Sequence, residues 1–67
     1  MSYTAILLKD PDGGYVAQNP ETGTTTQGDT LDEALANLRE ATELYLEEFP
    51  LAATPPAFMT TFELSHT

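Results

Sequence analysis

Few residues in this sequence could do acid–base or nucleophilic chemistry. His66 is the single histidine, one residue from the C-terminal end, and there is no cysteine. Nucleophilic catalysis needs a serine, threonine or cysteine beside a base, which is commonly a histidine, and a chain end is poorly held. We therefore expect no catalytic or metal-binding role for His66, and we expect that the protein is not an enzyme.

Three acidic residues have the spacing of a calcium-binding loop. Asp10, Asp12 and Glu21 fall at positions 1, 3 and 12 of that loop, which supply oxygen ligands. The same register puts Gly14 at position 5, where a side-chain oxygen is expected, and Tyr15 at position 6, where glycine makes the turn. We expect a hairpin turn here, with neither a metal ion nor a cofactor.

Charge limits the classes of partner. Eleven Asp and Glu residues against only Lys9 and Arg39 give a formal net charge of -9 over 67 residues. Nucleic-acid binding draws most of its affinity from Lys and Arg at phosphates, so we expect no direct binding of DNA or RNA. A small basic protein is the natural partner, because complementary fields speed association. The alternative is an acidic surface that only keeps the protein soluble.

No segment has the character of a targeting signal or a membrane span. The longest wholly apolar run near the start covers residues 5–8, whereas a membrane-spanning helix needs roughly 20 apolar residues. The absence of cysteine favours a reducing compartment. We expect a cytoplasmic protein that does not contact a membrane.

Alternation and turn residues place the first three strands. Residues 3–8 have largely apolar side chains on both faces, which favours a strand in the middle of a sheet. Residues 15–18 and 24–27 are predicted as the second and third strands, separated by turn clusters at residues 10–14 and 19–23. The third strand has little apolar surface to bury, so we expect it at the edge.

A helix is predicted over residues 31–48. Thr30 as N-cap and Glu33 three residues later form a capping box, and Pro50 disfavours helical geometry in the residue before it. One stripe of the helix should pack on the sheet while acidic residues fall opposite. The stripe consists of Leu31, Ala34, Leu35, Leu38, Ala41, Thr42, Tyr45, Leu46 and Phe49.

The chain should return to the sheet after a connection over residues 51–56. Residues 58–64 alternate in polarity and are predicted as a fourth strand. The order β-β-β-α-β gives an α+β class, an antiparallel-rich sheet with one helix on one face, as a single domain over residues 1–67. Apolar side chains on the other face favour a homo-oligomer through this open sheet face. They are Ile6, Leu8 and Val16.

An ordered set of motifs runs through the chain. It comprises Tyr15-Val16-Ala17, Pro20 in the following turn, Gly28-Asp29-Thr30, and Glu33-Ala34-Leu35-Ala36-Asn37-Leu38-Arg39-Glu40-Ala41. In this order the set resembles the HicB family of bacterial and archaeal antitoxins, and the likeness covers nearly the whole chain. The turn from Pro20 to Gly23 departs from the family pattern, being one residue shorter and lacking a second proline.

The resemblance implies a partial RNase-H-like or ferredoxin-like domain that binds and masks HicA, a small basic toxin that cleaves messenger RNA. Such an inhibitor covers the toxin's catalytic and RNA-binding surface and needs no chemistry of its own. Many members of the family carry a second, DNA-binding domain. We expect no such C-terminal domain here, and therefore no autoregulation by this chain alone.

Candidate partner-binding residues lie on the acidic face of the predicted helix, with Leu44 as an apolar anchor, and in the segment around the second turn. They are Tyr15, Pro20, Glu21, Asp32, Glu33, Glu40, Glu43, Leu44 and Glu47. Two alternatives stay open. One is an orphan homo-oligomeric structural or regulatory module of the same fold without a toxin. The other is an enzyme of reduced RNase-H type, for which Asp10 and Asp12 alone are a poor start.

Overall fold

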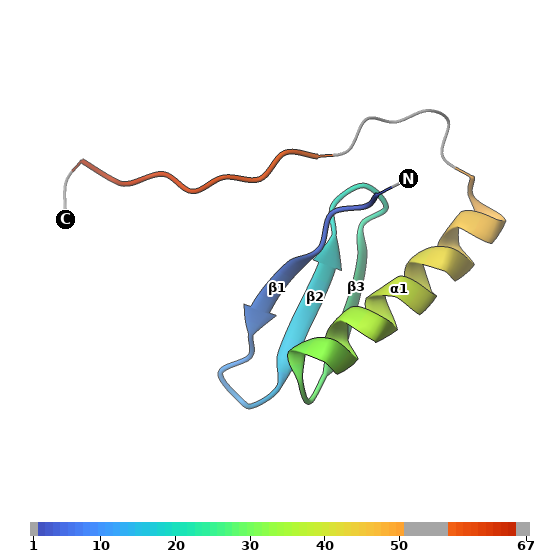
Figure 1. Cartoon of the computed structure of the whole chain (residues 1–67), viewed down its shortest axis with the longest axis horizontal. Coiled ribbons are helices and arrows are strands. Elements are labelled where there is room, and N and C mark those ends of the chain that lie inside the picture. Colours follow the sequence, from blue (N-terminus) through green and yellow to red (C-terminus); the bar gives the residue numbers. More distant parts are fainter. Residues whose placement is uncertain (1, 51–56, 66–67) are drawn as a thin grey trace.

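A three-stranded sheet and one helix make up the body of the protein. The computed structural model describes residues 2–50 and 57–65. Its elements are β1 (Ile6–Lys9), β2 (Tyr15–Asn19), β3 (Thr24–Gly28) and α1 (Leu31–Glu48). The sheet is antiparallel in the order β1-β2-β3, and α1 packs on one of its faces (Figure 1). The predicted α+β class, antiparallel sheet and helix on one face are confirmed.

The turn between β1 and β2 is built by glycine. Gly13 and Gly14 have φ angles of 110° and 79°, a region that residues with a Cβ rarely adopt. The turn is closed by the backbone N–H of Asp10, which donates to the carbonyl of Gly14 at 3.0 Å. The expected hairpin is therefore formed, with Lys9 opposite Tyr15 as its last pair.

β1 is shorter than predicted at its start because side chains replace the sheet hydrogen bonds there. The Thr4 carbonyl accepts from Asn19 Nδ2 at 2.7 Å, and the Thr4 N–H donates to Glu21 Oε1 at 2.8 Å. Regular pairing begins only at Ile6, opposite Gln18. β3 lies at an edge, as expected, but β1 lies at the other edge and not in the middle of the sheet.

α1 begins and ends where the sequence predicts. Thr30 is the N-cap, and its Oγ1 accepts from the backbone N–H of Glu33 at 3.0 Å. Two contacts then fix the helix on β3. The Thr26 hydroxyl donates to the carbonyl of Ala34 at 3.0 Å, and Asn37 Nδ2 donates to a β3 carbonyl at 2.8 Å.

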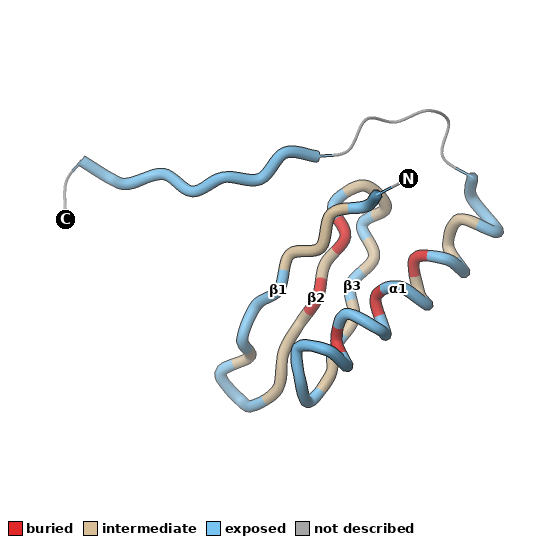
Figure 2. The backbone as a smooth tube through the Cα atoms, viewed as in Figure 1, coloured by how far each residue is buried: buried red, intermediate tan, exposed pale blue. Residues whose placement is uncertain are grey.

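The core is small and lies between β2 and α1 (Figure 2). Its buried apolar residues are Ala17, Ala34 and Leu38. The predicted apolar stripe is only partly covered, because Leu31 and Leu35 remain 46% and 44% exposed. α1 lies over β3 and β2 and barely reaches β1, so the stripe's other side stays open. Phe49, just beyond the helix, is exposed as well.

The fourth strand expected over residues 58–64 is not formed in this structure. Residues 57–65 contain no strand, and every one of their side chains is exposed. In Figure 1 this segment, drawn in red, runs away from the sheet and has no strand beside it. The expected connection over residues 51–56, and His66, lie outside the described residues.

Candidate functional site

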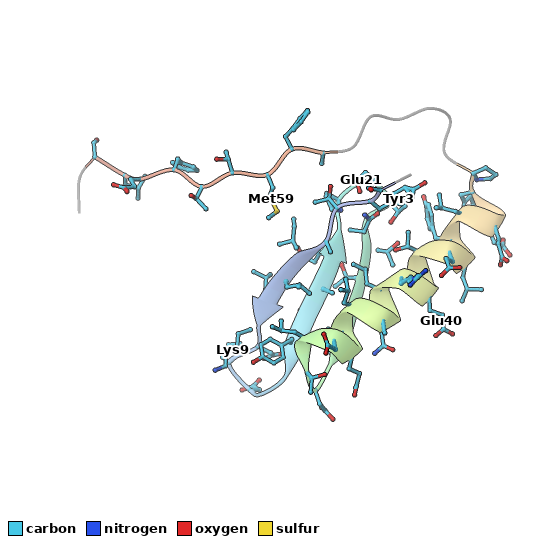
Figure 3. The ribbon with its side chains drawn as sticks, in the orientation of Figure 1. Tyr3, Lys9, Glu21, Glu40 and Met59 are labelled. Carbon is cyan, nitrogen blue, oxygen red and sulfur yellow. The ribbon has the colours of Figure 1, made fainter. Side chains whose placement is uncertain are left out.

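The acidic helix face is the most highly charged surface of the protein. We define it as Asp32, Glu33, Glu40, Glu43 and Glu47, all of them exposed. The buried side of α1 is formed by other residues, at three- and four-residue spacing, so these carboxylates project from its outer side. Figure 3 shows Glu40 pointing away from the sheet. The structure thus brings these five predicted residues together on one surface.

Little compensates this charge. Arg39 Nε lies 3.7 Å from Glu43 Oε1, but both side chains are highly exposed, and such a pair contributes little. Glu33 Oε1 accepts from the N–H of Asp29, the residue before the N-cap, at 3.3 Å. In the ranges that the structure describes, no cation lies within salt-bridge distance of the other three carboxylates. They are Asp32, Glu40 and Glu47.

Leu44 gives this surface an apolar component. It is 57% exposed, one turn beyond Glu40 on the same side of α1. An apolar side chain surrounded by charged groups is the composition of an interface anchor with a polar rim. The acidic helix face with Leu44 therefore suits a partner that carries cations around a small apolar recess.

Glu21, one of the predicted partner contacts, takes part in a hydrogen-bond network of the scaffold. It is partly buried in the loop between β2 and β3, near the N-terminal residues (Figure 3). Its Oε1 accepts from Thr4 N–H at 2.8 Å and from Asn19 Nδ2 at 2.6 Å, and its Oε2 accepts from Ala57 N–H at 2.7 Å. Hydrogen bonds from Ala57, then from Thr4 and Asn19, lower its pKa from 4.5 to about 2.

Asn19 is the structural residue that sequence reasoning missed. Its side chain is 1% exposed and uses both ends, with Nδ2 donating to the Thr4 carbonyl and to Glu21. Its Oδ1 accepts from the N–H and the hydroxyl of Thr22 at 2.8 and 2.6 Å. The only signal in the sequence is an asparagine before proline at a turn, which indicates the turn but not the burial.

Tyr15 meets the acidic helix face only at Glu33, with which it lines a small pocket, and Pro20 does not join this face. Tyr15 is partly buried and packs against the apolar core, whereas Pro20 is exposed beyond the other end of β2. About five residues of extended chain, roughly 16 Å, separate them. The predicted contacts therefore comprise one helical surface, Tyr15 beside its residue Glu33, and two residues apart from it, Pro20 and Glu21.

An open groove of about 930 Å³ adjoins the acidic helix face. Its walls include Tyr3 and Ala5 on one side and Leu35 and Leu46 of α1 on the other. Thr42 also lines it, with a buried hydroxyl that has no hydrogen-bond partner among the described residues. The groove exists because α1 does not extend over β1, which helix periodicity alone does not reveal.

Within residues 2–50 and 57–65, no three acidic or histidine side chains are grouped in a way that could hold a metal ion. In the same ranges, no helix combines the length and the apolar character needed to cross a membrane.

Comparison with known proteins identifies relatives. Residues 3–58 match a family described as "Family of unknown function (DUF7387)". The UPF0150 protein ssr1765 of Synechocystis is 51% identical over 47 residues, which cover 69% of this chain and 60% of the relative. The UPF0150 protein Ta0767 of Thermoplasma acidophilum is 50% identical over 48 residues, 70% of each chain. A UPF0150 protein of Archaeoglobus fulgidus is 44% identical over 48 residues, again 70% of each.

The matches cover most of this chain but only part of the relatives' length. The chain spans 60% of the length of the Synechocystis relative. The family match begins before β1 and extends beyond α1 to residue 58. No solved structure matches the chain significantly. The chain therefore belongs to the DUF7387 family of unknown function, and its relatives are UPF0150 proteins.

Proposed function

We propose that this protein is an antitoxin-type inhibitor that binds and masks a small basic HicA-like toxin, which cleaves messenger RNA. The observation that carries the proposal is the acidic helix face with Leu44 beside it. The ordered motifs from Tyr15 to Ala41, which resemble the HicB family, supply the class of partner. The protein acts in the cytoplasm, where such a toxin meets its substrate.

The charge distribution supports binding to a basic protein. With a net charge of -9, the protein attracts cationic partners at long range and raises their association rate. Asp32, Glu40 and Glu47 can each gain a cationic partner without first losing one. Leu44 adds the apolar contact that slows dissociation once the charges have aligned the partner.

Inhibition by masking requires affinity and placement but no reaction. An acidic surface that occupies the cationic surface of an RNA-cleaving protein competes with the phosphates that bind there. The same property makes the complex sensitive to salt, because screening weakens the exposed charge pairs. No enzymatic activity, metal or cofactor forms part of this proposal.

The first experiment isolates the partner. The tagged chain is purified gently from its own host at low salt, and the bound material is weighed by intact mass spectrometry. We expect a small, strongly basic companion that dissociates as salt rises, and that cleaves RNA when freed of this protein. Recovery of the chain without such a companion, with the neighbouring gene expressed, contradicts the proposal.

Charge reversal then tests the surface. Glu40→Lys and Glu47→Lys should each weaken binding of the companion about tenfold or more at low salt, because each replaces an attraction by a repulsion. Asp12→Lys is the matched control, since it makes the same change in net charge in the exposed turn between β1 and β2, outside the acidic helix face. Equal losses of affinity in all three variants would show that binding depends on net charge and not on the acidic helix face.

A second candidate is an orphan homo-oligomer of the same fold, which the open sheet face favours. Leu8 is 48% exposed there, and its neighbours Ile6 and Val16 are only partly buried. A symmetric self-assembly that persists at every salt concentration, with no basic companion, supports this module instead of the antitoxin.

A further inference from the structure

Among the described residues, those of the extended C-terminal segment carry the most exposed large apolar side chains. We define it as residues 57–65. Phe58 is 99% exposed, Phe62 84%, Leu64 73% and Met59 62%. In Figure 2 the whole segment has the colour of exposed residues. A monomeric protein rarely leaves so much contiguous apolar surface in water, so the segment requires a covering surface.

The start of this segment is held beside the beginning of β1. The Ala57 N–H donates to Glu21 Oε2 at 2.7 Å, and the Thr4 hydroxyl donates to the Ala57 carbonyl at 3.3 Å. From Ala57 the chain leads away from its own sheet (Figure 1). The start of the segment is thus anchored, while the described residues beyond it pair with no strand of the same chain.

β1 lacks a neighbouring strand on one of its two sides. It is an edge strand, and an edge presents backbone N–H and C=O groups that no neighbour pairs. Leu7 and Leu8, which point to opposite faces of the sheet, are 39% and 48% exposed. Apolar side chains on both faces are the pattern of an inner strand, so the composition of β1 calls for one more strand beside it.

We propose that residues 58–64 add as a strand to the β1 edge of a second copy, and that the two copies exchange these segments symmetrically. The exchange is intermolecular because the segment leaves Ala57 in the direction away from its own β1. Main-chain hydrogen bonds supply affinity, as in other cases of strand addition. Mutual exchange closes the assembly at two copies.

The exchanged strand also covers side chains that the lone chain leaves in water. Its alternation places Phe58, Thr60, Phe62 and Leu64 on one face. On the helix side of the sheet, that face meets the exposed Leu7 and the open groove beside Leu35. Both partners in the contact therefore lose apolar exposure.

Charge permits this contact in spite of the acidic composition. Glu63 is the only charged residue among residues 57–65, and Lys9 is the only one in β1. The two paired segments therefore carry one charge of each sign, although Asp32, Glu40 and Glu43 line the neighbouring groove together with Arg39. Glu33 and Glu47 of the acidic helix face do not line the groove, and the inference rests on the β1 edge and the C-terminal segment, so it does not depend on the proposed partner.

Engineered cysteines test the exchange directly, because the sequence contains no cysteine of its own. One chain carries Leu8→Cys, and a second, co-expressed chain carries Met59→Cys, Thr61→Cys or Glu63→Cys. Neighbouring strands bring paired residues within disulfide range. We expect a disulfide-linked heterodimer for at least one of the three pairs, identified by its mass. Asp12→Cys in place of Leu8→Cys is the control and should give none.

A chain that carries both cysteines separates the two topologies. An intramolecular bridge in a monomer means that the segment folds back on its own β1, and overturns the exchange. Absence of any cross-link in all three pairs overturns it as well. Sedimentation of the unmodified chain should show a concentration-dependent dimer, and a monomer at every concentration again refutes the proposal.

Proline gives a variant that does not rely on cross-linking. Thr60→Pro and Thr61→Pro remove backbone N–H donors from successive positions, one of which must face β1 in any register. At least one of them should raise the dimer dissociation constant tenfold or more. Ser65→Pro, just beyond the proposed strand, should leave it unchanged. Equal dissociation constants for all four chains would exclude strand addition.

Discussion

Asn19 and Glu21 tie together three parts of the chain that are distant in sequence. Their side chains hold the Thr4 backbone, the turn at Thr22 and the beginning of the C-terminal segment at Ala57. The groups of Thr4, Asn19 and Thr22 are buried or partly buried and would otherwise need water, whereas Ala57 is exposed. At the irregular end of the sheet, this network therefore supplies the backbone hydrogen bonds that strand pairing supplies in the regular part.

The Glu21 carboxylate should make stability depend on acid pH. Its pKa is about 2 in the folded protein against an ordinary 4.5. The stability that it contributes is therefore complete above about 4.5 and is lost as pH falls toward 2. We expect Glu21→Gln to unfold at lower urea than the parent at pH 7, with the difference shrinking between pH 4.5 and 2.

Asp12→Asn is the control for this titration, because it removes a carboxylate from an exposed turn. Its difference from the parent should stay small throughout the same pH range. A difference between Glu21→Gln and the parent that stays constant from pH 7 to pH 2 would contradict the role of the ionised Glu21 carboxylate.

At the scale of elements, the helix was the easiest to predict from the sequence. Thr30 and Glu33 define its start by local chemistry, and Pro50 limits its end. The acidic helix face follows directly from these bounds, so most of the candidate site could be predicted. The role of Glu21 could not, because its partners Thr4 and Ala57 come from distant parts of the chain.

The three strands that are separated by clear turns could be predicted from the sequence. The glycines at Gly13, Gly14 and Gly23, all with positive φ, separate β1, β2 and β3. The edge position of β1 and the unpaired state of residues 57–65 could not be predicted, because alternation indicates a strand without naming its neighbour. Both departures have one origin, because the predicted fourth strand does not pair with β1 in this structure.

The junction of β3 and α1 depends on the lack of a side chain at Gly28. A Cβ built there would lie 2.8 Å from Ala34 Cα, closer than real Cβ contacts allow. We expect Gly28→Ala to lower the free energy of unfolding by about 3 kcal/mol, because the helix must shift away from the sheet. Urea denaturation followed by circular dichroism measures this loss.

Gly23→Ala is the comparison for this prediction. A Cβ at Gly23 meets nothing within 4 Å, and its φ of 79° leaves only backbone strain, about 1–2 kcal/mol. Gly28→Ala should therefore cost more than Gly23→Ala. The reverse order would show that close packing at this junction contributes little.

For the whole molecule, repulsion among carboxylates is the dominant electrostatic term. Eleven acidic residues face only two basic ones, within a body at most 44 Å long. At 0.01 M salt the screening length is about 30 Å, against about 8 Å at 0.15 M. Added NaCl should therefore raise stability by about 1 kcal/mol, or about 4–8 °C in Tm.

Differential scanning calorimetry at 0.01 and 0.15 M NaCl measures this rise. The double variant Glu40→Gln/Glu47→Gln should begin at a higher Tm and gain less from salt, since it has two fewer exposed carboxylates. A Tm that falls with NaCl in the parent would mean that attractive pairs such as Arg39–Glu43 outweigh the repulsion.

The order of strands in the sheet has a consequence for the order in which the chain folds. Each element of the body contacts the one next to it along the chain, from β1 to β2, β3 and α1. Chains with such local contacts fold quickly, since little loop entropy is lost before contacts form. The bond from Ala57 to Glu21 spans 36 residues and closes last. The body can thus form before this long-range bond closes, because none of the contacts between its elements requires the C-terminal segment.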